Sequence, residues 1–161
     1  KTNNRLYPLG LYKGVFWQDD PRLIYVGMQD QYYTFNMFDA QAWYARDVIL
    51  GRIELPANGE QVADIAHWVE REGQVADPFQ AIDFQAAYIR DLVQPTDYPE
   101  FDVEGVAEIF KEWEHHKEAD ILGYRNQSYR STLTGTLAPA HHMPWMEAMD
   151  DSLETFLSEP A

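Results

Sequence analysis

The sequence predicts an α/β fold in which a few short strands and one buried helix are followed by a mainly helical region. Three observations support this. Apolar runs of strand length precede residue 30, a helical segment near residues 37–50 is apolar around most of its circumference, and amphipathic helical patterns follow. With 45% hydrophobic and 14% aromatic residues, the 161-residue chain can bury a sizeable core despite a net charge of −15. We predict a first region at residues 1–55 and a second at 56–161.

Two apolar runs predict the strands. The first covers residues 11–17, the second covers residues 22–28, and turn-forming residues lie between them. This spacing predicts a hairpin or two adjacent strands. The second run is continuously apolar through residues 23–26 and ends at Gly27, which predicts a strand buried on both faces.

The helix that follows is predicted to begin with Asn36 as its N-cap and to end before Gly51. Its polar residues form only a narrow strip, at Asp39, Arg46 and Asp47. Because most of this helix is apolar, most of its surface needs a covering layer. A piece of 161 residues can hardly supply that cover by itself.

Four later segments are predicted to be helices. The first has an apolar stripe within residues 62–69, and the second begins with Asp77 as N-cap and Pro78 at the first helical position. The third begins near Asp102, and the last spans residues 145–157 after a proline. The region after residue 56 is therefore expected to be mainly helical.

Composition excludes several classes of function. Because the chain has no cysteine, disulfides, thiolate metal sites and cysteine nucleophiles are excluded, and a reducing compartment is favoured. The excess of acidic residues, 27 against 12 basic ones, disfavours nucleic acid and anionic membranes as partners. No apolar run approaches membrane-spanning length. Since the chain begins at Lys1 without a methionine or a secretory signal, we expect a fragment of a longer cytoplasmic protein.

Two carboxylate–histidine pairs raise the possibility of a metal site. Asp64 with His67, and Glu112 with His115, each place a carboxylate and an imidazole on one helical face. A carboxylate-bridged di-iron site needs two further inward glutamates on other helices, and the pattern does not supply them. Surface or capping histidines are the better interpretation, so no metal is predicted.

The segment before the buried helix is the candidate binding site. Gln31 and Thr34 can form directed hydrogen bonds, and Tyr32 and Tyr33 offer flat ring faces, next to the positive end of a helix. Such a helix start suits a carbonyl, a phosphate or a developing anion. The structural alternative is that these side chains only cap and pack.

Four long strings resemble the C-terminal part of bacterial flavin-containing monooxygenases of the trimethylamine monooxygenase type. They are GMQDQYYTFNMFDAQAWYARD at residues 27–47, EWEHHK at 112–117, YRNQSYRS at 124–131 and TGTLAPAHHMPW at 134–145. The resemblance implies a fragment of a flavoprotein with two dinucleotide-binding domains, in which residues 1–55 complete the FAD-binding domain and residues 56–161 cover the active site. The chain lacks a G-x-G-x-x-G fingerprint, so an N-terminal portion of the same enzyme is the expected partner.

The family's chemistry implies FAD and NADPH as cofactors. The resemblance implies that a C4a-hydroperoxyflavin transfers one oxygen atom of O2 to a soft nucleophile, such as trimethylamine, another small amine or a thioether. A homodimer is expected. Because the flavin carries the reaction, no catalytic residue is expected in this stretch.

The resemblance also assigns residues to roles. Gln31 and Thr34 match positions that contact FAD, while Arg125 and Trp113 match positions near NADP. Tyr32 stands where close relatives carry tryptophan, so it is expected to line the substrate pocket, whose size and polarity are then in question. The alternative function is a non-enzymatic acidic helical module that binds a partner through residues 37–50.

Overall fold

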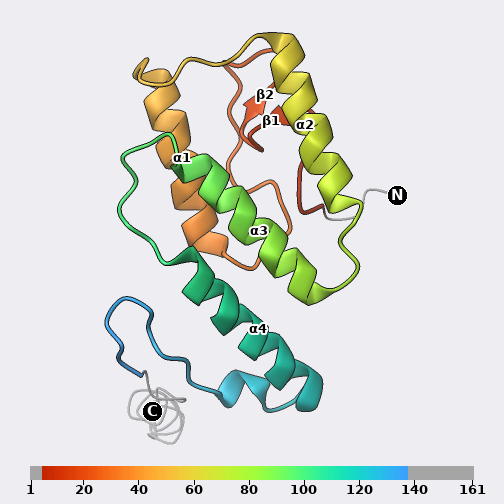
Figure 1. Ribbon diagram of the computed structural model, residues 1–161, viewed down its shortest axis with the longest axis vertical. Coiled ribbons are helices and arrows are strands. Elements are labelled where there is room, and N and C mark those ends of the chain that lie inside the picture. Colours follow the sequence, from red (N-terminus) through yellow and green to blue (C-terminus); the bar gives the residue numbers. More distant parts are fainter. Residues whose placement is uncertain (1–4, 138–161) are drawn as a thin grey trace, which may run out of the picture. The chain divides into compact units, whose positions relative to one another are not determined.

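The computed structural model describes residues 5–137 (Figure 1). Within these residues the chain is mainly helical with one small sheet. Its elements are β1 (Leu11–Tyr12), β2 (Phe16–Trp17), α1 (Thr34–Ile49), α2 (Asn58–Glu72), α3 (Pro78–Val93), α4 (Val103–Ala119) and the 3-10 helix η1 (Tyr124–Asn126). The chain forms two compact units, Lys1–Glu114 and His115–Ala161, and each is described by itself. The helix predicted at 145–157 and the end of the 134–145 string lie outside the described residues.

β1 and β2 form an antiparallel pair in which Leu11 lies opposite Trp17. The predicted single strand over residues 11–17 is therefore wrong, because a tight turn folds this run back on itself. Lys13 and Gly14 both adopt left-handed backbone conformations, with φ of 52° and 65°. A Cβ atom at Gly14 would lie 2.4 Å from the hydroxyl of Tyr88, so glycine is the residue that fits this turn.

The turn is tied to two helices by the Lys13 ammonium. Its Nζ atom lies 2.8 Å from Asp64 of α2 and 2.7 Å from Asp91 of α3. Burial by itself would lower the pKa of Lys13, but the hydrogen bonds to the two carboxylates outweigh burial and raise it. The cation therefore links the turn between β1 and β2 to α2 and α3.

The prediction of a buried strand over residues 22–28 is wrong. Leu23, Ile24, Tyr25 and Val26 are 36–49% exposed. Ile24 forms a single antiparallel bridge with Phe16, and the Tyr25 N–H donates to the Val15 carbonyl at 2.9 Å. The segment runs beside β2, and the described residues cover its apolar side chains only in part.

α1 is buried on one face rather than around most of its circumference. It begins at Thr34, with Tyr33 as N-cap and no side-chain cap, so Asn36 lies inside the helix and the predicted N-cap is wrong. Gly51 follows the helix end with φ of 69°, which confirms its predicted role. Asp47, predicted on the polar strip, is buried. Hydrogen bonds from Arg46 and Arg52 to its carboxylate offset the cost of burying the charge.

α3 lies beside α1 and α2 (Figure 1). Trp68 of α2 packs edge-on against Phe84 and Tyr88 of α3 and stacks on Tyr7, with ring centroids 5.3–5.9 Å apart. The face of α2 that carries Trp68 is therefore the buried one. The buried residues of α2 are Gln61, Ile65 and Trp68. The predicted stripe within 62–69 is therefore partly wrong, since Val62 and Ala66 are exposed.

The starts of α3 and α4 are confirmed. Asp77 is the N-cap of α3, its Oδ1 accepts from the Gln80 N–H at 2.8 Å, and Pro78 is the first helical residue. α4 begins at Val103, and Asp102 Oδ1 accepts from the Gly105 N–H at 2.9 Å.

Candidate functional site

Residues 27–33 form a loop that leads into α1, and two buried glutamines hold it. We call residues 27–33 the glutamine-held loop. Gln41 of α1 holds its beginning, because the Gly27 N–H donates to Gln41 Oε1 at 2.8 Å. Gly27 has φ of 75°, and a Cβ atom there would lie 2.4 Å from the Phe38 ring. Glycine is therefore required where the loop crosses α1.

The Gln41 amide also connects the loop to the core. Its Nε2 donates to Gln29 Oε1 at 3.0 Å and to the Tyr88 hydroxyl at 2.9 Å. That hydroxyl donates in turn to the Lys13 carbonyl at 2.6 Å. Burial raises the pKa of Tyr88, so this donor keeps its proton well beyond neutral pH. The first half of the loop thus belongs to one buried polar network.

Gln85 of α3 holds the second half of the loop. It is fully buried, its Nε2 donates to the Asp30 carbonyl at 2.7 Å, and its Oε1 accepts from the Tyr32 N–H at 2.8 Å. Gln31 lies between these two contacts. Among the described residues, the buried Gln31 Oε1 has no hydrogen-bond partner. A buried acceptor without a donor is unfavourable, so this atom is suited to a donor from outside the described chain.

Thr34 opens α1 with an unusual backbone. Its φ is 29°, and its hydroxyl donates to the Tyr32 carbonyl at 3.3 Å. The first turn of α1 carries no acidic residue, and its N-cap makes no side-chain hydrogen bond. This helix start therefore presents its positive end without a side-chain cap.

Tyr32 leaves the loop towards α4. Its hydroxyl donates to Glu114 Oε1 at 2.9 Å, and its ring lies edge-on to Phe110 and Trp113, with centroids 5.9 and 6.4 Å away. Burial, followed by the hydrogen bond to Glu114, raises the pKa of Tyr32. The structure thus brings together Tyr32 and Trp113, two of the residues selected from the sequence.

Glu114 is a site residue that sequence analysis missed. It is 2% exposed although it is a carboxylate. The sequence did contain a pattern that indicates its burial. Residues 103, 107, 110 and 114 follow helical spacing, and the first three are apolar or aromatic. A charged residue at the fourth position of such a stripe indicates a buried polar contact, here with Tyr32.

Arg125 belongs to the second unit, within η1. Its guanidinium carbon lies 4.5 Å from the centroid of the Tyr124 ring, and Tyr124 is itself buried. Stacking on an aromatic face orients the plane of an arginine side chain. In the same unit, His116 Nδ1 lies 2.9 Å from the Tyr129 hydroxyl.

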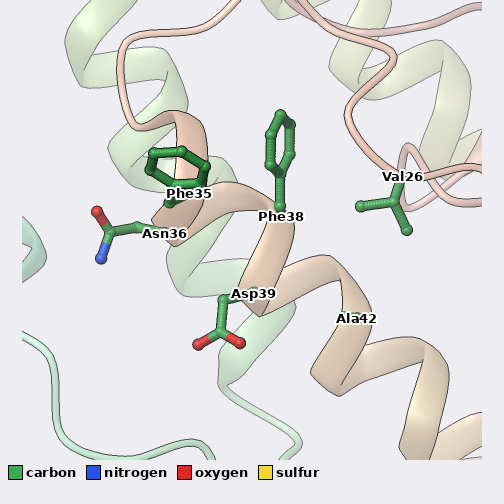
Figure 2. Close-up of a pocket in the computed structure, with 6 residues that line it drawn as sticks. All are labelled: Val26, Phe35, Asn36, Phe38, Asp39 and Ala42. Carbon is green, nitrogen blue, oxygen red and sulfur yellow. The ribbon is translucent and has the colours of Figure 1, made fainter.

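The outer face of α1 carries a pocket of about 570 Å³. Its lining residues are Val26, Phe35, Asn36, Phe38, Asp39 and Ala42 (Figure 2). The rings of Phe35 and Phe38 lie edge-on with centroids 6.3 Å apart, and Val26 approaches from the neighbouring segment (Figure 2). Phe35 is 81% exposed, so this face is apolar and uncovered within residues 5–137. We call it the outer face of α1.

The candidate metal pairs are not assembled into a site in the described part of the chain. No group of three or more His, Asp or Glu side chains is placed there to hold a metal ion. Asp64 binds Lys13 instead, while His67 and His115 are exposed, as the surface interpretation predicted. Across residues 5–137, every helix is too short or too polar to cross a membrane.

Comparisons with known proteins find several similar proteins, and their names agree. No protein-family model matches the chain. The chain is 64% identical over 160 residues to the trimethylamine monooxygenase of Methylocella silvestris and 56% identical over 159 residues to that of a Pelagibacter species. A flavin-containing monooxygenase of Aspergillus flavus is 29% identical over 119 residues. A crystal structure of Tmm from Pelagibacter sp. strain HTCC7211 matches 97% of the chain with a TM-score of 0.85.

These similarities place the chain among the relatives of the flavin-containing monooxygenases. Its particular relatives are the bacterial trimethylamine monooxygenases, and the resemblance expected from the sequence is confirmed. The matches cover 99% of this chain but only 36% of each of the two bacterial proteins. The chain therefore spans about a third of the length of these relatives.

Proposed function

We propose that this chain is the C-terminal portion of an FAD- and NADPH-dependent monooxygenase that oxygenates soft nucleophiles, trimethylamine foremost. The observation that carries the proposal is 64% identity over 99% of the chain to a protein named for that activity. In this proposal residues 1–55 complete the FAD-binding domain, and residues 56–161 cover the active site. A cytoplasmic homodimer remains part of the same expectation.

The glutamine-held loop fits a flavin nucleotide. The buried Gln31 Oε1, with no partner among the described residues, is suited to an N–H or hydroxyl donor of FAD. Thr34 opens a helix without a side-chain cap, which favours a negatively polarised group nearby. Bound FAD, reduced by NADPH, supplies the activation of oxygen, while this chain's residues bind, orient and exclude water.

Arg125 is proposed to contact NADPH. Its guanidinium stacks on the buried Tyr124 ring, and a planar arginine suits a phosphate group. Trp113 is assigned to the same side of the site by resemblance. Its edge-on contact with Tyr32 places it against the residue proposed to line the substrate pocket.

The hydroxyl of Tyr32 already has a hydrogen-bond partner within the chain. It donates to Glu114, so the polar group that distinguishes tyrosine from tryptophan is already satisfied. The part of Tyr32 that remains for a substrate is its ring, which suits the methyl groups of a small tertiary amine. The pocket is therefore proposed to have an aromatic wall rather than a polar one.

The proposed partner is the remaining portion of the same enzyme. The exposed outer face of α1, with Phe35 and the pocket beside Phe38, is the surface proposed to receive it. An exposed apolar face of this kind would also serve a non-enzymatic interaction module. The identity to named monooxygenases favours the enzyme.

The test uses the longer protein that contains this chain. We expect it to purify with bound flavin, and to oxidise NADPH faster when trimethylamine or a small thioether is added. Arg125→Ala should raise the KM for NADPH at least about tenfold while FAD stays bound, because only a phosphate contact is lost. A protein without flavin, or NADPH oxidation that ignores every amine and thioether offered, would contradict the proposal.

A further inference from the structure

We propose that Gln85 is a positioning residue for FAD, because it fixes the backbone on both sides of Gln31 and so sets the orientation of the Gln31 side chain. The inference rests on the proposed function. It assigns a role to a residue of α3 that is separated from Gln31 by more than fifty positions in the sequence.

The contacts of Gln85 involve both peptide groups that flank Gln31. The Asp30 carbonyl belongs to the peptide between residues 30 and 31, and the Tyr32 N–H belongs to the peptide between residues 31 and 32. Gln85 Nε2 donates to the first at 2.7 Å, and Gln85 Oε1 accepts from the second at 2.8 Å. One side chain therefore restrains the backbone on either side of Gln31.

A glutamine is suited to this task. Its carboxamide carries a donor and an acceptor on one planar group, whereas an ionised glutamate has no donor and methionine has no comparable donor or acceptor. Gln85 is fully buried, and its neighbours Phe84 and Ala86 are buried as well. A side chain fixed by the core on a helix positions a loop more accurately than contacts within the loop itself.

Gln31 supplies the independent observation. Its Oε1 is buried without a hydrogen-bond partner among the described residues, although its own N–H donates to Asp30 Oδ1 at 3.0 Å. The loop therefore holds this acceptor in a position where it is unsatisfied. A hydrogen-bond donor on a bound ligand would satisfy this acceptor.

The experiment measures FAD affinity in the longer protein. FAD is removed, and the apoprotein is titrated with FAD while flavin fluorescence is followed. Gln85→Met, which has similar volume but neither hydrogen bond, is expected to raise the Kd about tenfold or more. The matched control is Gln61→Met, because Gln61 is also a buried helical glutamine but donates to the Pro56 carbonyl, away from the loop. Its Kd should change less than about twofold, although the Tm of both apoproteins falls.

A second arm separates positioning from general destabilisation. If Gln85 acts through Gln31, the Gln31→Ala variant and the double variant should have nearly the same Kd. The inference would be overturned if the two substitutions raised the Kd independently, so that their fold-changes multiplied in the double variant. It would also be overturned if the Kd of Gln85→Met were within twofold of the wild-type value. Should Gln85→Met not fold, Gln85→Asn replaces it, since asparagine keeps the amide but is one methylene shorter and should not reach both the Asp30 carbonyl and the Tyr32 N–H. Failure of the wild-type protein to bind FAD would overturn the proposed function as well.

Discussion

Both faces of α1 carry large apolar residues, but their surroundings are opposite. On the inner face, Met37 and Gln41 are fully buried against the core. On the outer face, Phe35 and Ile49 are 81% and 69% exposed. The residue types alone therefore do not decide which face is covered. The covering elements decide, and within residues 5–137 the chain provides them for the inner face only.

The two faces of α1 also differ in what they do for the candidate site. The inner face organises the glutamine-held loop, because Gln41 binds the Gly27 N–H and the Tyr88 hydroxyl. The outer face carries a pocket of about 570 Å³, and there Asp39 accepts a hydrogen bond from the Tyr98 hydroxyl at 2.8 Å. We infer that the inner face stabilises the site and that the outer face receives the rest of the enzyme.

The largest expected effect lies on the inner face. Met37→Ala removes a fully buried side chain from the core, and it should lower the free energy of unfolding of the longer protein by about 2–5 kcal/mol. Urea denaturation followed by tryptophan fluorescence measures this. The control is Val62→Ala on α2, a half-exposed position that should change by about 0.5 kcal/mol or less. Equal effects at the two positions would contradict the assignment of the inner face.

The outer face should matter once the rest of the enzyme covers it. Phe35→Ala in the longer protein is expected to lower the free energy of unfolding by about 2 kcal/mol, because a covered phenylalanine loses its buried area. Leu122→Ala is the control, since the Leu122 side chain is 92% exposed. If the Phe35 variant changes stability no more than the Leu122 variant, the outer face is not the covered surface.

A polar change on the inner face is expected to have a smaller effect than Met37→Ala. Gln41→Met keeps the volume but leaves the Gly27 N–H without its acceptor, so stability should fall by about 1–3 kcal/mol. Thermal unfolding measures the loss of stability. Gln74→Met serves as the control, because Gln74 is exposed. A variant as stable as the wild type would show that the Gln41 network is not needed to hold the loop.

The smallest effect should appear only at high pH. Tyr98 donates to Asp39 on α1, and burial followed by this hydrogen bond raises the pKa of Tyr98 to about 12. The unfolded chain loses this proton near pH 10, so the free energy of unfolding falls as pH rises from about 10 to 12. Tyr98→Phe should flatten that fall and change stability by about 0.5 kcal/mol at pH 7. Denaturation at pH 7 and pH 11 measures both. An unchanged alkaline slope would contradict the pKa assignment.

Sequence reasoning predicted the features that depend on neighbouring residues. Asp77 and Pro78 define the start of α3, and Gly51 defines the end of α1, because capping requires only a few adjacent positions. Features that depend on contacts from outside the segment itself were predicted wrongly. The burial of Asp47 depends in part on Arg52, beyond the helix end, and the rotation of α2 depends on the rings that surround Trp68.

The candidate site shows the same limit. The loop and the aromatic residues were selected from the sequence, but Gln85 and Glu114 were not. Both are polar residues at buried helical positions, and their partners lie more than fifty residues away. A stripe of otherwise apolar residues that contains one polar residue was the available signal. The identity of the partner required the fold.

The Lys13 ammonium offers a way to observe the hairpin turn directly. Its side chain is 12% exposed and its charged form is favoured by two carboxylates, so an amine-reactive reagent should modify it slowly in the folded chain. A lysine in the unfolded chain should react faster. The rate of labelling at Lys13 would then report how often the turn separates from α2 and α3, which makes this residue a built-in probe of local opening.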